Sequence, residues 1–335
     1  MTSVVDVVLR PQEVRSVASV EAELRVMLAK GAMDLPQPGG GNTAQRWAVL
    51  ARWGRRDLAL ARLAEGHTDA VAILAEGDRL PAPAGLYGVW AARSGGTGAR
   101  LRRAPGGLLL SGRVRFCSGA GSVDRALVVA HPPADNPGDS LLVEVALADA
   151  RVQRRPQTWR TASMDAADTQ DVDFDDVPLK PDAVVGEPGW YTARCGFARG
   201  GAGVAAVWWG GATGVLDRAL RHLPDSPDPH QLAHLGELHA LLEASDALLG
   251  RTAALIDATP GADHRLAVAA VRSAVERAVR EVVDRVPRMV GPAPLSRDAE
   301  LARSVADLQL YVRQHHGERD HAALGAQLLA QRRAR

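Results

Sequence analysis

The stretch Leu108–Ala130, LLLSGRVRFCSGAGSVDRALVVA, decides the fold, because it joins two short apolar runs through a turn of small residues. The runs Leu108–Leu110 and Ala126–Ala130 are rich in residues that favour strands, so we expect two strands of an antiparallel sheet. Between them, Phe116–Ser118 (Phe-Cys-Ser) gives one strand an aromatic face beside a hydroxyl. This combination suits a planar heteroaromatic ligand lying on the sheet, although an ordinary strand end has the same composition.

The composition is that of a water-soluble globular protein. The 335 residues are 46% hydrophobic, enough for one large core or two to three modules. No apolar stretch approaches the about 18 residues of a membrane-spanning helix, and the N-terminal MTSVVDVVLRPQEVR is not a basic segment followed by an apolar core, so we expect a cytoplasmic protein. Forty basic side chains balance thirty-nine acidic ones, which argues against a nucleic-acid partner. Cys117 and Cys195 have no disulfide-framework or metal-ligand spacing and are expected to be reduced.

The first part of the chain is predicted to be helical. Val14–Lys30 carries apolar residues at intervals of three and four, which indicates an amphipathic helix. Pro36–Gly41, PQPGGG, is a loop without the Lys-Ser or Lys-Thr of a phosphate-binding loop. Two further helices follow in residues 44–78, where a lone His67 is expected to cap or to hydrogen-bond in the core rather than to act in catalysis. Pro81–Gly85 ends this region.

The middle part changes to short strands. In residues 86–185, apolar segments alternate with turns rich in Gly, Pro, Asn and Asp, which predicts a small β-barrel or sandwich. Trp90, in the segment Tyr87–Ala92, fits a core position of such a domain. Asp175 and Asp176 are neighbours on a strand, so their carboxylates point to opposite faces and are poorly placed to share a proton.

From Gly186 to its end the chain is predicted to be helical. Residues 196–220 are rich in Gly and Ala, and Gly201-x-Gly203-x-x-Ala206 has the spacing of a dinucleotide fingerprint, but no strand precedes it. We therefore interpret the small residues as contacts between closely packed helices. Start signals divide the rest into three further helices, and four helices with short loops indicate an antiparallel bundle. These three helices are predicted to begin at Asp228, Asp263 and Ser296, and the second to end at Arg285, before Pro287.

The last predicted helix contains most of the polar residues of possible chemical interest, in residues 299–325, AELARSVADLQLYVRQHHGERDHAALG. Its apolar face leaves His315, His316 and His321 to be explained. Adjacent histidines cannot point the same way on a helix, and the sequence has no HExxH or Cys/His spacing, so we predict no metal site. Solvated charge on an exposed helix face is the simplest interpretation of these residues.

Three segments of the sequence resemble the acyl-CoA dehydrogenase family. They are LSGRVRFCSGAGSVDRALVVA, DVDFDDVPLKPDAVVGEPG and RGGAGVAAVWWGGATGVL, within a region that runs roughly from Leu58 to Leu324. The resemblance implies an α+β fold with an N-terminal helical domain (1–84), a middle β-barrel domain (85–186) and a C-terminal four-helix bundle (187–335). It also implies FAD as the cofactor, held between the β domain and the bundle.

The resemblance also implies particular site residues. In the family, a Trp or Phe, a small or branched residue and a Thr or Ser follow one another against the flavin ring, and Phe116, Cys117 and Ser118 match them. Trp90 stands where the family has a hydroxyl and would shield the ring. The register of the last helix places the family's catalytic Glu at His315, whose imidazole we expect to take the α-proton of the substrate.

Two departures mark a trimmed, divergent member. The N-terminal domain is short, and the connection that carries an Arg and a Phe for a neighbouring subunit's dinucleotide in the family reads HLPDSPDPHQ here. Our main prediction is a flavin-dependent dehydrogenase acting on an acyl thioester or related substrate, by α-proton abstraction and transfer of the β-hydride to flavin N5. A flavin monooxygenase or oxidase of the same fold and a non-catalytic relative remain open.

The resemblance also bears on partners. It implies a small-molecule or acyl-CoA substrate, and it is compatible with an electron-transfer partner. Together with the Gly/Ala-rich helix of residues 196–220, it predicts a homodimer or homotetramer formed through the bundle. No membrane partner is expected.

Overall fold

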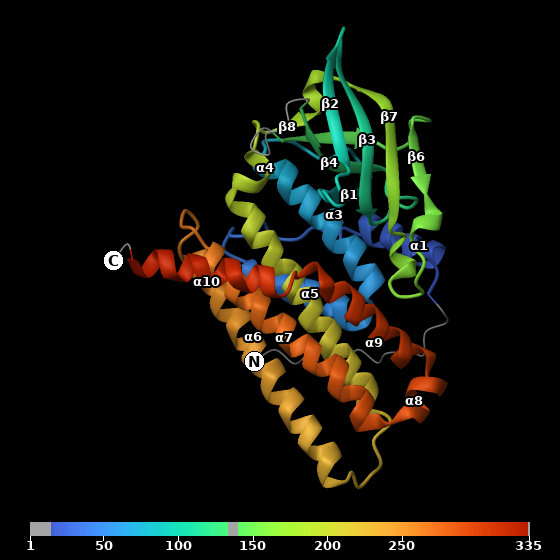
Figure 1. Ribbon diagram of the computed structural model, residues 1–335, viewed down its shortest axis with the longest axis vertical. Helices are drawn as coiled ribbons and strands as arrows, with labels where there is room; N and C mark the ends of the chain where they lie inside the picture. The colour runs from blue at the N-terminus through green and yellow to red at the C-terminus, as the bar shows by residue number, and fades with distance from the viewer. Residues whose placement is uncertain (1–14, 133–139, 334–335) are drawn as a thin grey trace.

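The computed structural model describes residues 15–132 and 140–333, with helices at both ends of the chain and a sheet in its middle (Figure 1). The first helices are α1 (Val17–Ala29), α2 (Thr43–Arg56) and α3 (Leu58–Glu76), close to the predicted positions. The N-terminal segment on which the location was predicted, Val14 included, lies almost wholly outside the described residues. Within these residues, no helix combines the length and apolarity needed to cross a membrane.

The described residues of the middle part form one eight-stranded mixed sheet. Its strands follow the order β6-β7-β3-β2-β4-β5-β8, and β1 pairs with β4. The two runs that decide the fold therefore lie in the same sheet, but β2 separates them and pairs antiparallel with β3 and parallel with β4. The described strands follow one continuous path of paired neighbours from β6 to β8. The bounds are β1 Tyr87–Trp90, β2 Gly98–Ala104, β3 Gly107–Cys117, β4 Arg125–His131, β5 Leu141–Ala146, β6 Val152–Arg155, β7 Gln170–Leu179 and β8 Val184–Val185.

Long helices form the C-terminal part of the chain, below the sheet in Figure 1. Our prediction that a helix ends before Pro287 is wrong, because α7 continues through this residue to Val290. Pro287 lacks the N–H of an ordinary helix residue and its ring crowds the preceding turn, but the buried side chains of Val286 and Met289 hold this last turn against the core. The helices are α4 Trp190–Ala193, α5 Cys195–Leu220, α6 Pro229–Ala258, α7 Arg265–Val290, α8 Pro292–Arg297, α9 Ala299–Tyr311 and α10 Glu318–Arg333.

The segment predicted as one last helix from Ser296 is two helices in the structure. The first, α9, starts after Asp298, whose carboxylate accepts the N–H groups of Glu300 and Leu301 and therefore caps the helix. It ends at Tyr311, and a short 3₁₀ turn and Gly317, at a φ of 56°, lead into α10. The histidines at 315 and 316 consequently lie in a turn rather than on a helix.

The Gly- and Ala-rich helix α5 is packed closely against α2, as the sequence predicts. A Cβ atom at Gly210 would lie 1.9 Å from the carbonyl oxygen of Ala51, and one at Gly54 would lie 2.2 Å from that of Val207. The two backbones can approach this closely only because no side chains separate them. Helix α3 contacts both α5 and β1, so it connects this helical layer to the sheet.

Candidate functional site

A cavity of about 510 Å³ lies where the sheet meets α3 and the end of α9. This volume is within the range of ordinary small-molecule and cofactor sites. Both the middle of the chain and its C-terminal part contribute to the wall. The lining residues are Arg62, Val89, Ala91, Ala92, Phe116, Ser118, Trp159, Met164, Thr169, Leu310, Tyr311, Arg313, Gln314 and His316.

The sheet contributes an aromatic side chain at a bulge near the end of β3. The register with β7 shifts between Val114 and Cys117, and Phe116 in this interval has a φ of 59°. A non-glycine residue in the left-handed region is strained, and such strain is concentrated at functional sites. The phenyl ring lines the cavity and is 57% exposed, so a flat apolar surface faces the open space.

Two hydroxyl groups lie next to this ring. The hydroxyl of Thr169 donates a hydrogen bond to the hydroxyl of Ser118, with 3.1 Å between the oxygens. Both residues line the cavity. A hydroxyl can donate and accept at once, so the pair can bond to a polar ring edge without breaking its own contact.

The helices contribute two buried polar groups that make no well-formed hydrogen bond. They are the hydroxyl oxygen of Tyr311, at the end of α9, and Nε of Arg62 on α3. Burial raises the pKa of Tyr311 above its ordinary value, although the neighbouring Arg62 acts in the opposite direction, so the hydroxyl stays neutral and can donate. Buried polar groups without partners are rare, and at a cavity wall they indicate a polar ligand.

The electrostatics of the cavity favour a ligand with negative charge or with acceptor groups. Arg62, Arg313 and His316 line it, and among the described residues no Asp or Glu does so. Glu65, which is not among the lining residues, accepts a hydrogen bond from Arg62 at 2.7 Å. Burial, assisted by the charge of Asp69 and opposed by that of Arg62, raises the pKa of Glu65 to about 8.

A buried carboxyl group holds the far wall of the cavity in place. Oδ1 of Asp307 on α9 accepts the backbone N–H of Met164 at 2.5 Å. Burial raises the pKa of Asp307 to about 6, although this hydrogen bond and Arg303 act in the opposite direction. The contact joins the bundle to the segment between β6 and β7.

The four flavin-site residues expected from the sequence divide into two pairs. Phe116 and Ser118 line the cavity, whereas Trp90 and Cys117 lie behind its wall, 2% and 0% exposed. The indole N–H of Trp90 donates to the carbonyl oxygen of Ser118 at 3.0 Å, so Trp90 stabilises the backbone behind the cavity wall. The side chain of Cys117 points to the opposite face of the strand from those of Phe116 and Ser118, into the core, where burial raises the pKa of its thiol.

The expectation that the imidazole of His315 faces the substrate is not what the structure shows. The ring of His315 is 4% exposed and turns toward α7, where Nε2 lies 3.3 Å from Oγ of Ser273. His316 lines the cavity instead. The cause is the end of α9 at Tyr311, because a turn rather than a helix then sets the direction of each histidine.

Arg62, Trp159, Thr169 and Tyr311 were not predicted as site residues. Arg62 and Tyr311 belong to amphipathic helices and were indistinguishable from residues of the packing face. Thr169 and Trp159 lie in segments with no pattern of their own. The one available signal was the DVDFDDV segment of the resemblance, which begins just after Thr169.

Comparison with known proteins confirms the fold that the sequence resemblance implied. The family model described as the acyl-CoA dehydrogenase C-terminal domain matches residues 187–312. Solved structures with the same arrangement cover nearly the whole chain, so the protein has the acyl-CoA dehydrogenase fold.

Several of the relatives and structures that it resembles are monooxygenases or are complexes with FMN. A dibenzothiophene monooxygenase of Rhodococcus erythropolis is 27% identical over an alignment 175 positions long. The match covers 45% of this chain and 42% of the relative, so it spans less than half of the relative's length. TdsC of Paenibacillus sp. A11-2, in a complex with FMN and indole, has a TM-score of 0.75 at 18% identity and covers 94% of this chain and 96% of its own. KijD3, in complex with FMN and a dTDP-linked sugar, has a TM-score of 0.78 at 22% identity and covers 93% of this chain and 86% of its own.

Proposed function

We propose that this protein is a flavin-dependent monooxygenase that uses FMN, rather than the acyl-CoA dehydrogenase that the sequence first suggests. The observation that carries the proposal is the charge of the cavity wall. No described carboxylate lines it, and the histidine at the position of the expected base points away from it. Abstraction of a weakly acidic α-proton requires a positioned base, whereas oxygen transfer by a reduced flavin does not depend on one.

The wall residues fit a flavin. Phe116 offers a flat face for the ring system, the Ser118–Thr169 pair bonds to a polar ring edge, and the buried hydroxyl of Tyr311 donates to an acceptor. Arg62 and Arg313 supply positive charge for a phosphate or for an anionic ring. When bound in reduced form, the flavin would supply the two electrons with which O₂ is cleaved, one oxygen atom entering the substrate and the other leaving as water.

Two observations favour FMN over FAD. The connection between α5 and α6, HLPDSPDPHQ, lacks the Arg and Phe that contact the dinucleotide in the resembling family. FMN is also the flavin in the complexes of TdsC and KijD3. The remaining apolar wall, which includes Trp159, Met164 and Leu310, suits a small and mainly apolar substrate.

The cavity residues have defined tasks in this proposal. The aromatic and apolar side chains exclude water from the ring. The hydroxyls of Ser118, Thr169 and Tyr311 fix its orientation. His316, on the turn after α9, is the lining group that can supply a proton to the leaving oxygen.

The proposal is tested by binding and by a single-turnover reaction. FMN and FAD are titrated separately into the purified chain by calorimetry, and we expect the tighter binding for FMN. Photoreduced FMN, O₂ and indole as a probe are then mixed with the protein, and mass spectrometry with ¹⁸O₂ follows the product. We expect one labelled oxygen atom in it.

A matched reaction separates the two candidate activities. Oxidised flavin and an acyl-CoA are mixed with the protein without O₂, and bleaching of the flavin is recorded. Fast bleaching would contradict the monooxygenase proposal and restore the dehydrogenase. If neither flavin binds at saturating concentration, the protein is the non-catalytic relative.

A further inference from the structure

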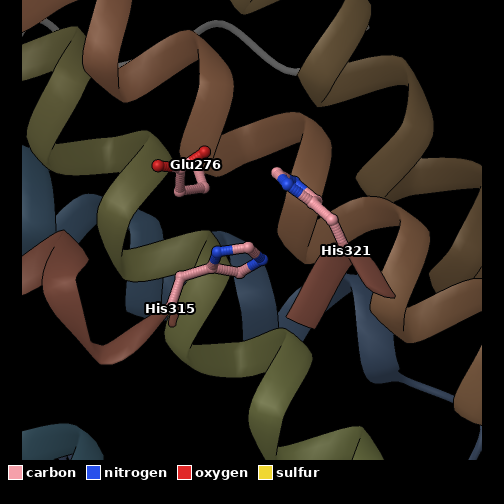
Figure 2. Close-up of side chains that lie close together, drawn as sticks. All are labelled: Glu276, His315 and His321. Atoms are coloured by element: carbon pink, nitrogen blue, oxygen red, sulfur yellow. The ribbon is translucent and has the colours of Figure 1, made fainter. Parts of the chain in front are cut away.

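Three side chains bring one carboxylate and two imidazoles together outside the cavity just described, as Figure 2 shows. Glu276 comes from the middle of α7, His315 from the turn after α9 and His321 from the first turn of α10. Each offers one oxygen or nitrogen atom, and these atoms lie within 4.8 Å of one another. Because α7 is distant in the sequence from the two histidines, a search by ligand spacing predicts no metal site here.

The carboxylate of this group is buried and only half satisfied. Glu276 is 3% exposed, and its Oε1 pairs with Nε of Arg280 at 2.9 Å. Its Oε2 is buried and has no hydrogen-bond partner. A buried carboxylate oxygen without a partner is costly, and a cation beside it removes this cost.

We propose that Glu276, His315 and His321 bind a divalent transition-metal ion, of which Zn²⁺ fits best. Two imidazoles and one carboxylate are a ligand set that Zn²⁺ takes with bonds of about 2.0–2.2 Å, leaving one position open. Such a tetrahedral ion needs ligand atoms roughly 3.4 Å apart. His321 is exposed, so rotation of its side chain can close the remaining distance.

The charges around the three residues are compatible with a cation. Oδ2 of Asp320 lies 4.0 Å from Nε2 of His315 and adds a second negative charge. The positive charge of the Arg272 guanidinium acts on His315 against the negative charge of Asp320 and so disfavours a cation there. With Arg280 on Glu276, two guanidinium groups balance the two carboxylates, so the ion would be held by the unpartnered Oε2 of Glu276 and the two imidazoles rather than by an excess of negative charge. Oγ of Ser273 lies 3.3 Å from Nε2 of His315.

Metal binding would change the turn that forms part of the cavity wall. Nδ1 of His315 now accepts the backbone N–H of Gly317 at 3.2 Å. Whichever ring nitrogen binds the metal, this contact is lost, because Nδ1 then holds either the metal or the remaining ring proton. In place of that contact, the metal would link the turn and α10 to α7. The linked turn includes His316, which lines the cavity.

The test is metal titration of the full chain, stripped with a chelator. Zn²⁺ is added in a calorimeter, and Co²⁺ is added separately so that its visible absorption reports the coordination geometry. We expect one site per chain, and a loss of affinity of about 10-fold or more in both His321→Ala and Glu276→Gln. His321 is on the surface, so its substitution leaves the fold intact even where Glu276→Gln does not.

The control is His239→Ala, which removes another exposed histidine, on α6, and should leave the site unchanged. Unaltered Zn²⁺ affinity in His321→Ala would overturn the proposal and assign the binding to other histidines. Absence of binding at micromolar Zn²⁺ would also overturn it. Flavin binding is measured on the same samples, so failure of the metal site and failure of the monooxygenase proposal are distinguished.

Discussion

Two polar groups at the cavity wall are buried without a well-formed hydrogen bond. Nε of Arg62 is buried without a partner, and the hydroxyl of Tyr311 is buried beside Arg62 without a well-formed hydrogen bond. In a well-packed protein each such atom costs free energy on folding, and binding sites are where this cost is tolerated. The ligand-free protein therefore keeps donors ready for a ligand at the expense of stability.

Tyr311→Phe should raise the stability of the ligand-free protein and lower its affinity for FMN. Without a ligand, the variant should be more stable by up to about 1 kcal/mol, because the buried hydroxyl that is removed has only Arg62 beside it and no well-formed hydrogen bond. FMN affinity should fall by roughly 3–10-fold, because one hydrogen bond to the ligand is lost. Urea unfolding and calorimetry measure the two quantities, and a variant that is both less stable and unaltered in FMN affinity would refute the role of this hydroxyl.

His67 is a buried histidine whose place in the fold requires the neutral ring. It is 5% exposed, and its Nδ1 accepts the backbone N–H of Tyr87 at 3.2 Å. Burial lowers the pKa of His67 to about 4. This is the core hydrogen-bonding role, not a catalytic one, that the sequence predicts.

The lowered pKa of His67 predicts a loss of stability in acid. The folded protein binds fewer protons than the unfolded chain below the ordinary pKa of 6.5, so stability is complete above that pH and falls as the pH drops toward about 4, by about 3 kcal/mol at most. In His67→Asn, whose amide oxygen can accept the same N–H, this loss should vanish. Asp307, with its raised pKa of about 6, acts in the opposite sense over part of this range, so the measured quantity is the difference between the two proteins in urea unfolding at several pH values. Parallel curves would contradict the assignment.

At the scale of elements, the contact between α2 and α5 depends on glycines at which the two backbones touch. We predict that Gly210→Ala destabilises the protein by about 1–3 kcal/mol or more, because its methyl group would lie 1.9 Å from the carbonyl oxygen of Ala51. Gly250→Ala in α6 is the matched control. Nothing lies within 4 Å of its new methyl group, so this variant should gain up to about 1 kcal/mol of helix stability. Thermal unfolding of both variants checks the pair, and equal effects would show that close packing is not the reason for the glycines.

The sequence predicts the helices and most strands well because their patterns are local. The apolar periodicity of α3 and the start of α6 at Asp228–Pro229 need nothing from the rest of the chain. The break after Tyr311 could not be predicted, because α10 has no buried residue of its own and its direction follows from contact with α7. The neighbours of each strand were equally invisible, since β2 comes between β3 and β4 only through long-range pairing.

At the scale of the whole molecule, the sheet side of the site was predictable and the helix side was not. Phe116 and Ser118 belong to one continuous motif, whereas Arg62 and Tyr311 reach the same cavity from helices far apart in the sequence. The orientation of His315 was missed for the same reason. Side-chain direction at a turn depends on the elements that the turn joins, and these are set by the tertiary fold.

The expected homodimer or homotetramer remains a prediction, but one of its reasons no longer holds. The small residues of α5 pack against α2 and α7 of the same chain and leave no stripe for a second copy. Contact between copies would have to use another face of the bundle, such as α6, where Leu232 and Leu255 are exposed. Light scattering at micromolar concentration measures the mass, and a stable monomer would contradict the prediction.

The cavity is built from segments of the chain that are distant in sequence, so a ligand in it should stabilise all of them together. Saturation with FMN at 100 times Kd should raise the free energy of unfolding by about 2.7 kcal/mol. Hydrogen exchange should show the same binding as slower exchange in three places: near Arg62 on α3, at the end of β3 around Phe116, and in the turn after Tyr311. Helix α6 takes no part in the cavity and is the internal control, so its exchange should not change locally. Protection confined to the sheet, with none at Arg62 or beyond Tyr311, would mean that the flavin lies outside this cavity and that the helix-side residues have another purpose.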